Sequence, residues 1–205
     1  LKAYVLYPYL QYEDLRSRRA RADDEEMSGF LEAHRSWAFT SGFEKAWLRP
    51  LGERERWDSV LRSGGVSDDT EIRCHFATAR IRRGLTDGLL PVAQTLWTAG
   101  KSQPDACDPV FAWLIRQEGI SSGLAWERFS LAMEARERKL ARYLLRFMNG
   151  DDRAWADRWL QQDRGGYRRL DGAARWPENE KAEIIFSFGL RRLARNDADR
   201  AWKVF

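Results

Sequence analysis

Two cysteines and two histidines are the residues of this sequence best suited to nucleophilic, redox or metal chemistry. Cys74 and Cys107 are the only thiols, and His34 and His75 are the only imidazoles. A zinc site needs about four ligands at regular spacing, and these residues do not complete a convincing set. A nucleophilic triad is not indicated, because neither histidine lies in a motif. Taken alone, the cysteines suit either buried free thiols in a reducing compartment or a disulfide in an oxidising one.

The acidic residues are numerous, but the sequence predicts that they are solvated. The glutamates considered as general acids all lie on polar-looking helical faces: Glu25, Glu26, Glu32, Glu127 and Glu134. A carboxyl group acts as an acid near neutral pH only where burial or a neighbour raises its pKa. The chain also lacks a glycine-rich phosphate loop, a Gly-x-Ser-x-Gly elbow and a His-Glu-x-x-His motif. We therefore predict no catalytic residue, no cofactor and no metal in this chain.

The stretch that must position the second cysteine runs over residues 89–111 and reads LLPVAQTLWTAGKSQPDACDPVF. Apolar residues at three- and four-residue spacing predict one buried helical face: Leu89, Val92, Leu96 and Trp97. Gly100 is predicted to end this helix in the left-handed region, and Pro104 prevents the helix from continuing. Asp108 before Pro109 predicts the N-cap of the next helix. The sequence therefore predicts a helix, an irregular turn and a second helix.

Helical periodicity continues through the rest of the chain, and no strand-like alternation is found. Asp23 and residues 68–70 predict acidic helix starts, and Pro50 is predicted to end a helix over residues 39–49. Tryptophans at helical spacing are predicted to lie in the core: Trp47, Trp57, Trp97, Trp113, Trp126 and Trp155. Short helices with short joints must pack as antiparallel hairpins. We predict an all-α chain without a sheet, a single domain over residues 1–205 in which hairpins stack as a degenerate, tetratricopeptide-like solenoid.

Composition limits the function classes. The 205 residues are 43% hydrophobic and 32% charged, and their net charge of +4 is a small excess of interspersed signs. This pattern predicts solvated helix faces rather than a nucleic-acid footprint. No apolar run approaches the ~20 residues of a membrane span. The chain opens with Leu1 inside an amphipathic pattern, so we expect a secretory signal to lie upstream of it.

Three stretches resemble the soluble lytic transglycosylases. The first is TLWTAGKSQPDACDPVF (residues 95–111), similar to that family's Leu-Trp-x-x-Gly-Lys-Ser-Gln-Pro-x-Ala-Cys-Asp loop. The second is LYPYLQY (residues 6–12), similar to the family's Leu-Tyr-Pro-Tyr-Leu-x-Tyr. The third is Cys74 within RCHFATARIRRG, at the place of the earlier family cysteine. The likeness covers residues 1–148, whereas residues 149–205 are placed by helical pattern alone.

The resemblance implies a right-handed α-superhelix, part of the U-shaped domain that precedes a lysozyme-like catalytic domain in these enzymes. It also implies a disulfide between Cys74 and Cys107, and hence a periplasmic protein. The family's catalytic domain carries a Glu-Ser pair, a Gly-Leu-Met-Gln segment and an Ala-Tyr-Asn segment, and none of the three occurs in this chain. The whole enzyme is expected to cleave peptidoglycan between N-acetylmuramic acid and N-acetylglucosamine, leaving 1,6-anhydro ends. This chain is expected to be a non-catalytic scaffold with glycan strands and the enzyme's own catalytic domain as partners.

Other functions stay open from the sequence. A stand-alone helical-repeat adaptor that binds a protein partner is the main alternative, and an RNA-binding helical repeat ranks below it, since it would need a basic stripe. Two groups of arginines could also meet the carboxylates of peptidoglycan peptides: Arg16, Arg18, Arg19 and Arg21, and Arg164, Arg168 and Arg169. Solvated tails and turns are the favoured explanation of both groups.

Overall fold

The computed structural model describes residues 4–19, 21–63, 67–165, 170, 172–173 and 175–205. Within these residues every regular element is a helix and none is a strand, so the predicted all-α class is confirmed. None of the described helices is long and apolar enough to cross a bilayer. The chain divides into two compact units: unit 1 is Leu1–Leu96 with Gln103–Gln117, and unit 2 is Trp97–Ser102 with Glu118–Phe205. The single domain expected over residues 1–205 stays a prediction.

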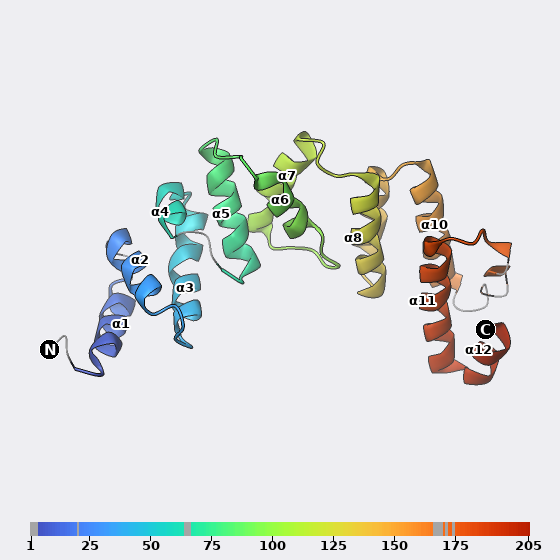
Figure 1. The fold of residues 1–205 in the computed structure, drawn as a ribbon, viewed down its shortest axis with the longest axis horizontal. Helices are drawn as coiled ribbons and strands as arrows, with labels where there is room; N and C mark the ends of the chain where they lie inside the picture. The colour runs from blue at the N-terminus through green and yellow to red at the C-terminus, as the bar shows by residue number, and fades with distance from the viewer. Residues whose placement is uncertain (1–3, 20, 64–66, 166–169, 171, 174) are drawn as a thin grey trace. The chain divides into compact units, whose positions relative to one another are not determined.

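Unit 1 holds the first half of the helices (Figure 1): α1 (Tyr7–Ser17), α2 (Asp24–Ala33), α3 (Thr40–Glu53), α4 (Trp57–Arg62), α5 (Thr70–Arg82), most of α6 (Leu89–Trp97), the 3₁₀ turn η1 (Asp105–Cys107) and α7 (Asp108–Arg116). Acidic caps start two of them, as predicted. The Asp23 carboxylate accepts a hydrogen bond from the Glu26 N–H at 3.4 Å. The Asp69 carboxylate accepts from the N–H groups of Glu71 and Ile72 at 3.1 and 3.2 Å.

Apolar faces of four helices form the core at the start of unit 1. Its buried side chains are Leu15, Met27, Phe30, Leu31, Phe43, Trp47, Leu48 and Ile72. Each such side chain contributes about 1.5–3 kcal/mol by leaving water. Farther along, α3 and α5 approach so closely that a Cβ on Gly52 would overlap the imidazole of His75. That glycine therefore allows the two helices to pack directly against each other.

Proline does not end α3, so that prediction was wrong. Pro50 lies inside the helix, which continues to Glu53. A proline removes one backbone donor and crowds the preceding turn, but here it stands one turn before the end. The helix closes instead where the N–H of Arg54 bonds to the Pro50 carbonyl at 3.1 Å and Glu55 turns left-handed, with a φ of 55°.

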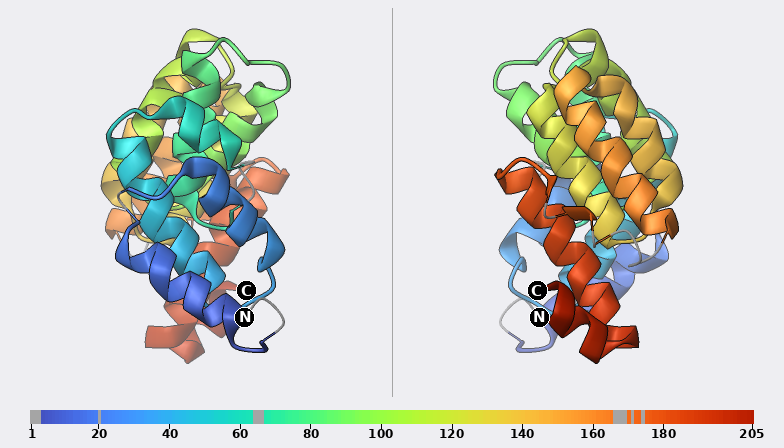
Figure 2. Two further views of the ribbon diagram at one scale, coloured as in Figure 1. Left: turned by 90° about the vertical axis from the view of Figure 1, so that its left-hand side faces the viewer. Right: turned by 90° about the vertical axis from the view of Figure 1, so that its right-hand side faces the viewer.

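Unit 2 contains α8 (Ser122–Glu134), α9 (Arg138–Leu144), the 3₁₀ turn η2 (Leu145–Phe147), α10 (Gly150–Gly165), α11 (Glu180–Asn196) and α12 (Ala198–Val204). Figure 2 shows α8, α9 and α10 running alongside one another, and α10 packs in turn on α11. Polar caps set three starts. Ser121 and Asn179 accept from Leu124 and Ala182 at 3.1 and 3.0 Å, and Asn149 accepts from Asp152 at 2.8 Å.

Aromatic rings fill the centre of unit 2. Trp159 is fully buried, and its ring centroid lies 6.0 Å from Trp126, 5.7 Å from Phe129 and 5.2 Å from Phe188. Of the six tryptophans predicted to lie in the core, four are buried: Trp47, Trp97, Trp113 and Trp126. Trp57 and Trp155 are half-buried.

The turn after α6 differs from the prediction in two details. Gly100 is not in the left-handed region. A Cβ at this position would lie 2.7 Å from the Leu131 carbonyl oxygen, so the glycine allows a close approach to the backbone of α8. Asp108 is not an N-cap but the first residue of α7, which follows the unpredicted turn η1. On α6 itself, Ala93 is buried whereas Val92 is 37% exposed, which shifts the predicted face by one residue.

Candidate functional site

The two cysteines are joined in a disulfide within unit 1. Cys74 lies in the middle of α5 and Cys107 ends η1, with 4.8 Å between their Cα atoms. The turn places Cys107 by a hydrogen bond from its N–H to the Pro104 carbonyl at 2.8 Å. Both side chains are fully buried. A bridge so enclosed is out of reach of thiol exchange, so its role is to hold α5 against η1 and α7.

The segment at the start of unit 2 is held by a buried cation. Arg128 of α8 is 4% exposed, and its Nε donates a hydrogen bond to the Ala99 carbonyl at 3.2 Å. Its guanidinium lies 4.6 Å from the centroid of the Trp97 ring. Burial lowers the pKa of Arg128 to about 10, so the side chain still carries its charge at neutral pH. With Gly100 packed on Leu131, this fixes residues 97–100 on α8.

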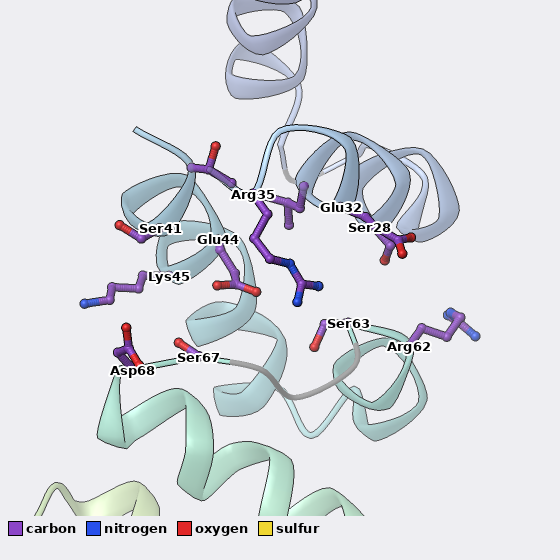
Figure 3. Close-up of a pocket in the computed structure, with 12 residues that line it drawn as sticks. Ser28, Glu32, Arg35, Ser41, Glu44, Lys45, Arg62, Ser63, Ser67 and Asp68 are labelled. Atoms are coloured by element: carbon purple, nitrogen blue, oxygen red, sulfur yellow. The ribbon is translucent and has the colours of Figure 1, made fainter. Parts of the chain in front are cut away.

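A pocket of about 660 Å³ lies in unit 1 beside α2, α3 and α4 (Figure 3). Its described lining is polar and of mixed charge: Ser28, Leu31, Glu32, Arg35, Thr40, Ser41, Glu44, Lys45, Arg62, Ser63, Ser67 and Asp68. Part of this charge is neutralised within the unit. Lys45 pairs with Asp69 at 3.0 Å, and Arg62 pairs with Asp24 at 2.6 Å.

Glu44 is the residue of this pocket that sequence reasoning missed. Burial raises the pKa of its carboxyl group, while the positive charges of Arg35 and Lys45 act in the opposite direction. Arg35 and Glu44 both extend into the middle of the pocket (Figure 3). A signal was present, because Glu44 precedes Trp47 and Leu48 by three and four positions and so shares their buried side of α3. Hydroxyl, carboxylate and guanidinium groups equip this pocket to hydrogen-bond a polar ligand, and no thiol or imidazole occurs among its described lining residues.

The charged residues singled out from the sequence lie at or near the surface where the structure describes them. The five glutamates considered as acids are all exposed, as expected for solvated faces. Two arginines of the first group form ion pairs: Arg16 with Glu13 at 2.9 Å, and Arg18 with Glu26 at 2.6 Å. Of the second group, Arg164 is exposed, whereas Arg168 and Arg169 lie outside the described residues. The described part of the chain contains no cluster of acidic, histidine or cysteine residues that could hold a metal ion.

Buried carboxylates in unit 2 are a second feature that the sequence did not predict. Asp152 of α10 accepts hydrogen bonds from Ser122 of α8 and Lys181 of α11. Burial alone would raise the pKa of Asp152, but these two donors lower it below its ordinary value. Asp163, with a side chain 6% exposed, pairs with Arg138 at 2.5 Å and also with Arg192. Each carboxylate thus ties α10 to two other helices.

Comparison with known proteins gives relatives of one kind. No protein-family model matches the chain. The chain is 30% identical over 209 residues to the soluble lytic murein transglycosylase of Salmonella typhimurium strain LT2, a match that covers 98% of this chain and 31% of that protein. It is 28% identical over 204 residues to the soluble lytic murein transglycosylase of Escherichia coli strain K12, again over 98% and 31%.

Solved structures agree with these relatives. The 70 kDa soluble lytic transglycosylase of Escherichia coli matches with a TM-score of 0.74 and 25% identity, over 98% of this chain and 33% of that one. An inactive mutant of the lytic transglycosylase Slt of Pseudomonas aeruginosa matches with a TM-score of 0.65 and 27% identity, over 100% and 33%. The chain therefore spans about a third of the length of its relatives, and the resemblance read from its motifs is confirmed.

Proposed function

The chain is a homologue of part of the soluble lytic murein transglycosylases, and from this premise we propose that it is the non-catalytic superhelical region of such an enzyme. The observation that carries the proposal is the extent of the similarity. It takes in 98% of this chain but only 31% of the relative, so two-thirds of the relative has no counterpart here. A lysozyme-like catalytic domain, with the Glu-Ser motif that this chain lacks, belongs in that remainder.

For the whole enzyme we propose the reaction that the resemblance implies. A single glutamic acid protonates the glycosidic oxygen as the bond between N-acetylmuramic acid and N-acetylglucosamine breaks. The same carboxylate then accepts the proton of the muramoyl C6 hydroxyl, whose oxygen attacks C1 and closes a 1,6-anhydro ring. Water is not consumed, so the second carboxylate of ordinary glycosidases is not required. A helical region adds nothing to these steps, and its role is to scaffold the catalytic domain and to limit which glycan strands reach it.

The properties of the described helices support such a scaffold. In unit 1 the buried disulfide fixes α5 against η1 and α7, and in unit 2 Asp152 and Asp163 fix α10 against its neighbours. Rigid walls restrict access better than mobile ones. The disulfide also favours the periplasm, because structural disulfides persist in oxidising compartments.

The proposal is tested by product analysis. Purified sacculi are incubated with this 205-residue chain and, separately, with the product of the complete reading frame that contains it, and the released muropeptides are identified by mass spectrometry. We expect anhydro-muropeptides from the longer protein and none from this chain. Reproducible release by this chain would overturn the division of roles. A reading frame that ends without a lysozyme-like domain, with a protein that releases nothing, would instead favour the stand-alone adaptor.

A further inference from the structure

Unit 2 carries a small pocket walled by arginines at the ends of two helices. Its volume is about 170 Å³, and its lining is Glu134, Arg136, Phe188, Arg191, Arg192 and Arg195. Glu134 is the last residue of α8, and the arginines after residue 190 occupy the final two turns of α11. We call this site the arginine pocket. None of its residues takes part in the disulfide or lines the pocket of Figure 3.

The sequence builds this pocket by helical spacing and by one unusual turn. Arg191, Arg192 and Arg195 follow Phe188 by three, four and seven positions, which places all four on one face of α11. Arg136 comes directly after the C-cap of α8 and has a φ of 63°. Glycine or asparagine is preferred at this position because the left-handed region costs other residues about 1–2 kcal/mol. An arginine here is conformationally unfavourable for the turn, yet it brings a guanidinium to the rim.

Charge in the pocket is not balanced from within. Glu134 pairs with Arg191 at 3.2 Å, and buried Asp163 is shared between Arg192 and Arg138. Counting Arg138, which lies outside the lining, five arginines share these two carboxylates. The ends of α8 and α11 offer only about half a negative charge each, so at least about two positive charges remain. Among the described residues, Arg136 and Arg195 form no ion pair, and both are exposed. Arg191 and Arg195, one helical turn apart, repel each other, which costs stability unless an anion lies between them.

Part of the pocket is already ordered for binding. Arg192 forms an ion pair with the buried carboxylate of Asp163, and its guanidinium lies 5.7 Å from the centroid of the Phe188 ring. Phe188 is 9% exposed and forms an apolar floor. A guanidinium fixed in this way loses little conformational entropy when it binds a ligand. Its N–H groups can donate two parallel hydrogen bonds to one carboxylate.

From these features we propose that the arginine pocket binds a carboxylate group on the peptide stems of peptidoglycan. This inference rests on the proposed function for the choice of ligand. The N-acetylated sugars of the glycan offer few charges, whereas the stems carry free carboxylates. The pocket therefore binds the peptides and not the sugars. A volume of about 170 Å³ accommodates a carboxylate with its adjoining carbons. Nucleic acid is a poorer fit, because it is bound along extended basic stripes rather than in one small pocket.

Calorimetric titration of this 205-residue chain with soluble glycan fragments tests the proposal. One set of fragments keeps its peptide stems, and a matched set has lost them to an amidase. We expect removal of the stems to weaken binding at least about tenfold, the loss expected when one charge-assisted hydrogen bond disappears. Arg136→Gln with Arg195→Gln should weaken binding of the stem-bearing set by a similar factor. Glu134→Gln should tighten it several-fold, because it releases Arg191.

Arg153→Gln is the matched control, since Arg153 is an exposed arginine of α10 away from the pocket lining. It should change affinity less than about twofold, and circular dichroism should show all variants folded. Equal binding of both fragment sets, or equal effects of the control and the pocket variants, would overturn the inference. These outcomes are independent of glycan cleavage. The inference can therefore fail while the longer protein still releases anhydro-muropeptides, and failure of the proposed function would be seen in that release.

Discussion

Removal of the disulfide gives the sharpest test of how unit 1 is held together. In the variant Cys74→Ala with Cys107→Ala, the unfolded chain regains the freedom of a loop whose ends are 33 residues apart. The loop-closure relation puts the lost stabilisation at roughly 3 to 4 kcal/mol. Both side chains are fully buried, so loss of their sulfur atoms adds to this value rather than offsetting it.

Urea denaturation gives the loss of stability, and hydrogen exchange with mass spectrometry gives its location. We expect amide exchange to rise most in α5, η1 and α7, where the two cysteines lie. Reductant should destabilise the parent chain by a similar amount and leave the alanine variant unchanged. The reasoning is refuted if the variant unfolds within about 1 kcal/mol of the parent, or if reductant acts on both chains alike.

Three further predictions concern single side chains. Gly100→Ala should lower the free energy of unfolding by about 1–3 kcal/mol, because its Cβ would press on the Leu131 carbonyl. Gly29→Ala, at an open position in α2, should raise it by about 0.5–1 kcal/mol, and denaturation curves of the two variants should shift in opposite directions. The folded-state pKa of Asp152 lies below its unfolded value, so its carboxylate stabilises the fold fully above about pH 5, and this stabilisation is lost as pH falls through the folded pKa. Asp152→Asn should therefore lower the free energy of unfolding at pH 7 and flatten the acid limb of a pH–stability curve. The pKa of Glu44 is raised, so ionisation of this carboxyl group disfavours the folded state. Glu44→Gln should therefore raise the melting temperature at pH 7, and the two proteins should melt at the same temperature below about pH 4, where Glu44 is protonated in both states.

Local signals were enough to predict several helix starts, because a capping side chain lies within one turn of the N–H groups that it caps. Asp23, Asp69 and Ser121 cap helices where their side-chain chemistry indicates. The cysteine pair came from resemblance to a family, since the spacing of two cysteines does not by itself distinguish a bridge from free thiols. Pro50 and Gly100 were misread for a common reason. Each was assigned its usual local meaning, whereas its actual setting depends on the rest of α3 or on the backbone of α8.

The buried charges could not be predicted because their partners lie on other helices. Asp152 and Lys181 are 29 residues apart, and so are Asp163 and Arg192. Each of these residues alone resembles an ordinary charge on a helix face. Only the packing of α10 on its neighbours turns them into buried pairs. The arginine pocket was missed for the same reason. Its two walls, the end of α8 and the end of α11, are more than 50 residues apart in sequence, and the paired residues Glu134 and Arg191 are separated by 57.

The two units use different chemistry to fix their helices, and this difference has a testable consequence. In unit 1 a covalent bridge joins α5 to η1, and its strength depends on the redox state of the surroundings rather than on pH. In unit 2 the Asp152 carboxylate joins α10 to α8 and α11, and its strength depends on pH rather than on reductant. Exchange at pH 7 should therefore rise in α5 and α7 once the bridge has been reduced in the unfolded chain and the chain refolded in reductant. Exchange at low pH without reductant should, after correction for intrinsic rates, rise first in α10 and α11. If both treatments loosened the same helices, the disulfide and the carboxylate would be acting on one shared structural unit, and this assignment of separate roles would be wrong.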